Sequence, residues 1–123
     1  MTPEFERAIP VLRIFDLAKA REFYVDFLGM GWDWEHRFAP DLPVFAQVSR
    51  GGLVLFLSEH FGDGTPGTKL ILRMRGLAAY QAELLARGYR HARPGIAEQP
   101  WGWRDMEIAD PFGNRLVFSE AVG

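Results

Sequence analysis

The side chains in this sequence that could hold a metal ion are three histidines and two glutamates: His36, His60, His91, Glu59 and Glu107. Imidazole nitrogen and carboxylate oxygen suit divalent transition metals. Glu59 and His60 are adjacent at a predicted strand end, where neighbouring side chains face opposite ways, which is poor geometry for sharing one ion. The sequence also has no G-x-S-x-G elbow, no P-loop and no cysteine. We therefore predict no catalytic residue and no relocated metal site.

Aromatic side chains point to binding instead. Aromatic residues make up 14% of the chain, and the four tryptophans come as two close pairs, 32/34 and 101/103. Aromatic faces attract planar rings and cations. Trp101 stands between a proline and a glycine in EQPWGWRDMEI, just before a predicted strand, so the loop presents its indole at the mouth of a groove. We expect Trp32 and Trp103 to pack in the core, and Trp34 and Trp101 to contact a ligand or an interface.

The chain contains an internal repeat. VLRIFDLAKA (residues 11–20) resembles ILRMRGLAAY (residues 71–80) at an offset of 60. LFLSE (residues 55–59) resembles LVFSE (residues 116–120) at an offset of 61. Two matches in the same order and at nearly one offset indicate a duplicated unit of about half the chain.

Hydrophobic periodicity and turn residues predict the order β-α-β-β-β in each half. The elements expected in the first half are a strand over 8–14, a helix from Asp16 as N-cap to Gly29, and strands over 32–38, 44–49 and 53–58. Those expected in the second half are a strand over 69–74, a helix over 77–87, a short extended piece near 89–92, and strands over 103–109 and 115–119. DPFGN is the turn between the last two strands.

We therefore predict an α+β fold made of two βαβββ repeat modules that form a curved mixed sheet around a cavity. Residues 1–123 form one domain, with module one at about 1–60, a glycine-rich linker at about 61–67 and module two at about 68–123. A sheet with a helix on one face leaves its other face open, and two such faces can enclose a concave site for a small ligand.

Composition limits the possible functions. A chain of 123 residues is the usual size of one domain, and its lack of cysteine excludes disulfides. No signal-peptide pattern and no membrane-length apolar run is present, so we expect a cytoplasmic protein without a membrane partner. The net charge is −2 with scattered Lys and Arg, so we expect no nucleic-acid partner.

The sequence resembles the bleomycin resistance proteins of the vicinal oxygen chelate superfamily, which also includes glyoxalase and extradiol dioxygenases. The segments AIPVLRIFDLAKAREFYVDFLGM, MRGLAAYQAEL and EQPWGWRDMEIADPFGNRLVFSE carry this resemblance across essentially the whole chain. EQPWG at a fixed distance before DPFGN is its most specific part. The resemblance implies the same doubled βαβββ arrangement, known as the glyoxalase/bleomycin resistance fold.

Metal-dependent members of the superfamily hold one divalent ion with four side chains. The resemblance places those positions at Ile9, Phe56, Lys69 and Val117, which the repeat relates in pairs at offsets of 60 and 61. An apolar side chain offers no lone pair, and a protonated lysine repels a cation. We therefore expect no metal and no cofactor, and we favour a binding function over an enzymatic one.

The resemblance implies a homodimer whose interface grooves sequester planar, cationic glycopeptide antibiotics, or similar compounds, without chemical change. It places Trp34 and Trp101 on either side of a planar ring, Asp33 against a cationic group, and Phe38 nearby on the second strand. Alternation along a strand puts Glu107 on the same face as Asp105. That face is either the wall of an acidic pocket or an ordinary solvent face.

Two other functions stay open on the sequence alone. One is a metal-dependent lyase or dioxygenase of the same superfamily with non-standard ligands. The other is an accessory domain whose pocket is filled by its own side chains. Proteins of this type that sequester such drugs are usually more acidic than a net charge of −2, and a related planar or cationic metabolite fits the resemblance equally well. The sequence also leaves open whether a dimer exchanges its N-terminal strand.

Overall fold

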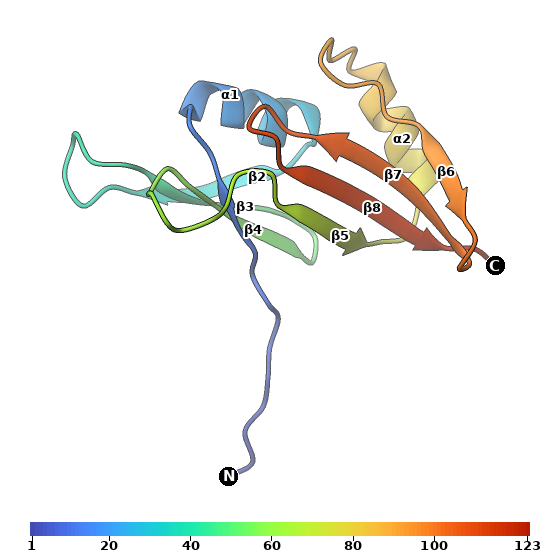
Figure 1. The fold of residues 1–123 in the computed structure, drawn as a ribbon, viewed down its shortest axis with the longest axis horizontal. Coiled ribbons are helices and arrows are strands. Elements are labelled where there is room, and N and C mark those ends of the chain that lie inside the picture. Colours follow the sequence, from blue (N-terminus) through green and yellow to red (C-terminus); the bar gives the residue numbers. More distant parts are fainter.

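The structure, a computed structural model, describes residues 1–123 and contains two four-stranded mixed sheets (Figure 1). The first sheet has the order β1-β4-β3-β2, with β1 (Val11–Arg13), β4 (Leu53–Ser58), β3 (Phe45–Arg50) and β2 (Gly31–His36). The second has the order β5-β8-β7-β6, with β5 (Lys69–Arg73), β8 (Arg115–Ala121), β7 (Trp103–Ala109) and β6 (Ile96–Gln99). In each sheet the first pair is parallel and the others are antiparallel. The predicted α+β arrangement of two βαβββ units is confirmed.

One helical segment follows the first strand of each sheet. In the first half it consists of α1 (Leu17–Arg21) and a π-helical turn, η1 (Glu22–Phe27); in the second it is α2 (Leu77–Ala86). Asp16 caps α1, since its carboxylate accepts a hydrogen bond from the Lys19 backbone N–H at 2.9 Å. Gly29 ends the segment at a positive φ of 77°. None of the helices is both long and apolar enough to cross a membrane.

Three predicted boundaries were wrong. β1 begins only at Val11, so Ile9 lies in the exposed segment that precedes the sheet. β2 ends at His36, so Phe38 lies beyond the strand. The extended piece expected near 89–92 is a turn, and the missing strand is β6 at Ile96–Gln99. Tyr89 in that turn contributes to the packing of the fold, because its ring stacks 4.6 Å from the ring of Phe27.

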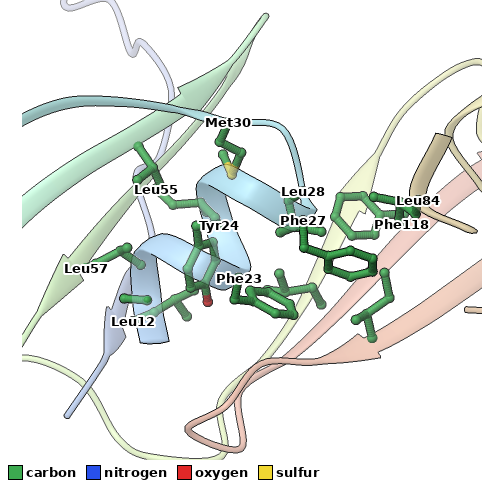
Figure 2. Packing of buried hydrophobic residues seen from close by; sticks show 14 of the residues in the cluster. Leu12, Phe23, Tyr24, Phe27, Leu28, Met30, Leu55, Leu57, Leu84 and Phe118 are labelled. Atoms are coloured by element: carbon green, nitrogen blue, oxygen red, sulfur yellow. The ribbon is translucent and has the colours of Figure 1, made fainter. Parts of the chain in front are cut away.

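A single hydrophobic core joins the two sheets beneath the helices. Phe23, Tyr24 and Phe27 of η1 are buried against residues of both sheets, among them Leu57 and Phe118 (Figure 2). Alternate strand residues point into this core, so the intervening ones lie on the other side of each sheet. We call that second side, which no helix covers, the open face.

A charged cluster also links the two halves. Glu83 of α2 accepts hydrogen bonds from Arg50 at the end of β3 (Nη2–Oε1 2.9 Å) and pairs with Arg87 (Nη1–Oε2 2.8 Å). The two arginines also donate to the backbone oxygens of Leu28 and Phe27 at the end of η1. The hydrogen bonds from Arg50, followed by those from Arg87, lower the pKa of Glu83 to about 2.

We expect Glu83→Gln to be less stable than the parent protein at pH 7, by up to about 1 kcal/mol for these partly exposed charges. A carboxylate with a lowered pKa contributes stability that is fully present above its unfolded pKa and is lost as the pH falls through its folded pKa. The difference between variant and parent should therefore shrink between pH 5 and the folded value of about 2. Urea unfolding at several pH values measures this difference in stability, with Glu98→Gln, at an exposed glutamate, as control. A difference that is independent of pH would contradict this role.

Candidate ligand-binding site

A β-bulge places two of the predicted site residues on one face of the first sheet. Trp32 pairs with Val48 but Trp34 already pairs with Gln47, so β2 has one residue more than β3 at this point. Without the bulge, Asp33 and Trp34 would face opposite sides. With it, Asp33 accepts a hydrogen bond from Gln47 Nε2 at 2.9 Å, while the ring of Trp34 reaches the same face.

Trp34 lies in an aromatic cluster on this open face. Its ring is 6.1 Å from that of Phe45 at an interplanar angle of 21°, and 5.6 Å from that of Phe56. Its exposed fraction is 42%, which is large for a tryptophan. The cluster therefore presents an accessible aromatic surface on the open face of the first sheet. Phe45 and Gln47 were not predicted as site residues, although the alternation of buried and exposed positions along β3 indicates their face.

Asp33 is a charged group beside this surface. Hydrogen bonds from Gln47 first, and then from Ser49, hold the pKa of the Asp33 carboxyl below its usual value. Asp33 is therefore ionised at neutral pH and can face a cationic group.

Phe38 lies in the loop that follows β2. It follows the end of β2, is 75% exposed, and makes edge contacts with the rings of His36 at 4.6 Å and His60 at 6.1 Å. The structure thus groups Phe38 with two histidines, and its predicted place on the second strand was wrong because the strand ends two residues earlier.

Trp101 occupies the turn between β6 and β7. Gly102 makes that turn possible, because its φ of 86° is in the left-handed region and its N–H donates to Gln99 O at 3.2 Å. The turn leaves Trp101 66% exposed. Its indole borders a pocket of about 310 Å³, which we call the second-sheet pocket. The residues that line it are Lys69, Gly95, Ala97, Gln99, Trp101, Asp105, Glu107 and Val117.

Glu107 lies in the same pocket, as a wall residue of β7. Met106 and Ile108 point into the core, so the predicted alternation along this strand is confirmed. Glu107 Oε1 is 3.8 Å from Lys69 Nζ. Asp105 accepts a hydrogen bond from the Ser119 hydroxyl at 2.6 Å. The Asp105/Glu107 face is therefore a pocket wall, and its carboxylates have polar partners.

The other two tryptophans are covered by arginines. The guanidinium of Arg21 lies 4.1 Å from the ring centre of Trp32, and that of Arg73 lies 3.3 Å from the ring centre of Trp103. One face of each of these indoles is thus occupied within the chain. No such cation lies over Trp34 or Trp101, which leaves these two as the accessible indoles.

The positions of the superfamily's metal ligands do not fit a metal ion. Phe56 packs against Trp34, Val117 is a buried apolar side chain, and Ile9 precedes the sheet. Lys69, the fourth, carries a positive charge. No group of three or more His, Asp or Glu side chains is placed to hold a metal. The donor set therefore lacks the lone pairs that a divalent ion requires.

The two accessible tryptophans lie on different sheets of one chain. Trp34 is on β2, the outer strand of the first sheet, and Trp101 adjoins β6, the outer strand of the second (Figure 1). A cavity of about 730 Å³ lies where the β3–β4 hairpin approaches β5 and α2. Its lining includes Arg50, Leu53 and Tyr80 but none of the predicted site residues.

Comparison with known proteins agrees with this architecture. The bleomycin-binding protein of Streptomyces verticillus, solved with copper(II)-bleomycin, is 27% identical over 99% of both chains, with a TM-score of 0.72. An antibiotic-binding protein from Streptomyces sp. CB03234 is 23% identical over 98% of this chain and 99% of its own, with a TM-score of 0.71. A glyoxalase-related enzyme from Clostridium phytofermentans is 20% identical over 98% of both chains, with a TM-score of 0.76.

No functionally curated protein sequence matched the chain. A family model described as "Glyoxalase superfamily protein" matches residues 2–123. The chain therefore belongs to the glyoxalase superfamily.

Proposed function

We propose that this protein binds a planar, antibiotic-like small molecule and holds it without chemical change. The observation that carries the proposal is the pair of uncovered indoles, Trp34 and Trp101, each on a sheet surface with polar side chains beside it. The full-length likeness to the bleomycin-binding protein of Streptomyces verticillus supports a ligand of this type. The four superfamily ligand positions offer no donor set for a metal, which favours binding over metal-dependent catalysis.

We propose further that the working form is a homodimer. Within one chain Trp34 lies on β2 and Trp101 adjoins β6, the outer strands of separate sheets (Figure 1), so we take the two indoles of one site from two chains. A two-fold dimer that sets the first sheet of one protomer against the second sheet of the other would form two equal sites. Each site would hold the ring between Trp34 and Trp101 of the partner subunit. Cytoplasmic location stays a prediction from the sequence.

Titration with metal-free and copper-loaded bleomycin, followed by tryptophan fluorescence and calorimetry, tests the ligand. We expect quenching and a measurable heat, with about one drug per chain from the two-fold symmetry. Saturating drug with unchanged emission and no heat would reject bleomycin. Sedimentation measurements test the dimer, and a monomer at binding concentrations would reject the shared site.

Chelation separates binding from metal-dependent chemistry. We expect prolonged treatment with EDTA to leave ligand affinity and melting temperature unchanged, because no donor set for a metal is present. Elemental analysis of the purified protein should show less than stoichiometric metal. A stoichiometric transition metal whose removal abolishes a lyase or dioxygenase activity would favour the enzymatic alternative.

A further inference from the structure

We propose that Lys69 makes the second-sheet pocket prefer a planar ring that carries an acidic oxygen, a carboxylate or phenolate, over the same ring with a neutral or cationic substituent at that end. This inference rests on the proposed binding function and specifies the ligand at one end of the site.

Lys69 presents an ammonium group without a hydrogen-bonding partner. Its nearest carboxylate oxygen, Oε1 of Glu107, is 3.8 Å away, which exceeds hydrogen-bond distance. The side chain is 48% exposed and lines the pocket with Trp101. An ammonium has three N–H donors and accepts none, so a ligand group that replaces water on it must be an acceptor. An anionic oxygen makes the strongest such contact.

The charges around the pocket are not net negative once its flanking strands are included. The lining has one cation, Lys69, and two carboxylates, Asp105 and Glu107. Two more cations of the same face, Arg73 and Arg115, stand on β5 and β8, and Arg115 pairs in register with Lys69. Asp105 is held by the Ser119 hydroxyl, which also accepts a hydrogen bond from Arg73 at 3.3 Å. Glu107 faces Lys69. A cationic substituent placed in this pocket therefore meets the ammonium of Lys69 and the two flanking arginines, whereas an anionic one is attracted by them.

The apolar part of the pocket suits a flat ring. Val117, 3% exposed, supplies a buried apolar surface, and Trp101 supplies an exposed aromatic face at the rim. The volume of about 310 Å³ is at the low end of small-molecule sites, roughly 300–1,000 Å³. A bicyclic ring against Trp101 can thus direct one acidic substituent at Lys69. The ammonium of Lys69 supplies a positive charge at that end of the pocket.

Three probes with one ring system and different charges test the proposal: naphthalene-2-carboxylate, naphthalene-2-methanol and 2-naphthylmethylammonium. Calorimetry on the full-length protein measures affinity at low and high salt. We expect the carboxylate to bind about tenfold more tightly than the alcohol, the ammonium to bind most weakly, and only the charged probes to respond to salt.

Variants assign the preference to one side chain. Lys69→Met should lower the affinity for the carboxylate probe to that for the alcohol probe, and should leave the affinity for the alcohol unchanged. Lys69→Arg should keep the preference for the carboxylate. Lys19→Met removes the same charge from the exposed surface of α1 and should change nothing. Melting temperatures confirm that each variant is folded.

The outcomes distinguish the two proposals. If the probes bind but the ammonium binds best, or if Lys69→Met keeps the preference for the carboxylate, the inference about Lys69 is wrong and the binding function stands. If none of the three probes binds at millimolar concentration while the protein is folded, both the inference and the proposed function are overturned.

Discussion

Replacing Asp110 by Ala should lower the free energy of unfolding by about 3–5 kcal/mol, the largest stability loss that we expect for a polar residue of this chain. Asp110 is 5% exposed, and its carboxylate is the acceptor for four hydrogen bonds. Its Oδ2 accepts from Tyr24 Oη at 2.6 Å and from Asn114 Nδ2 at 2.8 Å. Its Oδ1 accepts from the backbone N–H groups of Phe112 at 2.9 Å and Asn114 at 2.8 Å. Alanine leaves these donors buried without this acceptor.

The network explains why the loss should be large. Burial first, and then the neighbouring Asp110 carboxylate, raise the pKa of Tyr24 well above its usual value, so the phenol stays a donor at every relevant pH. Asn114 also donates to Arg13 O at 2.9 Å at the end of β1. The DPFGN turn of the second half is thus tied to η1 and β1 of the first half, and its loss loosens the contact between the halves.

Urea unfolding at pH 7 measures the effect, with two comparisons. Tyr24→Phe removes one hydrogen bond and should cost about 1 kcal/mol, because Asn114 still donates to the same oxygen. Asp26→Ala removes an exposed carboxylate from η1 and should stay within about 0.5 kcal/mol of the parent protein. If Asp110→Ala behaves like Asp26→Ala, the network does not stabilise the fold.

The sequence predicted the fold well where local signals agree with tertiary packing. The cap at Asp16, the stop at Gly29 and the strand Trp103–Ala109 all appear as expected. The signals are strong there because each cap or turn residue satisfies a specific backbone requirement. They failed near residues 89–92, where an extended segment was predicted and a turn is present. The aromatic residue there, Tyr89, packs on Phe27 across the fold, and its presence does not indicate a strand.

The candidate site was less accessible to sequence reasoning. Strand alternation alone separates Asp33 from Trp34, and only the bulge in β2, set by its pairing with β3, places both on one face. The sequence singled out Lys69 only as a position unable to bind metal. Its role beside Glu107 depends on the register of β5, β8 and β7, which a single strand cannot reveal.

Trp101→Ala should weaken binding of a planar ligand by about 2 kcal/mol, on the order of 30-fold, with little change in stability. The indole is 66% exposed and has no aromatic or cationic partner within the chain, so few contacts of the folded protein depend on it. Calorimetric titration and thermal unfolding measure the two quantities separately. Phe61→Ala removes another exposed aromatic side chain, 95% exposed and outside the second-sheet pocket, and should affect neither. A loss of stability equal to the loss of affinity would make Trp101 a packing residue.

Mixing two variants with weakened binding tests whether each site takes its tryptophans from both protomers. A homodimer of Trp34→Ala or of Trp101→Ala lacks one indole at both sites. In a mixed dimer, Trp101 from one chain meets Trp34 from the other at one site, while the second site lacks both. Random exchange should therefore restore tight binding at about a quarter of all sites. Sites built within single chains would give no recovery, since no chain in the mixture carries both indoles. Recovery to this level, absent from either variant alone, requires Trp34 and Trp101 to act across the interface, the arrangement that we propose from their places on the outer strands of the two sheets.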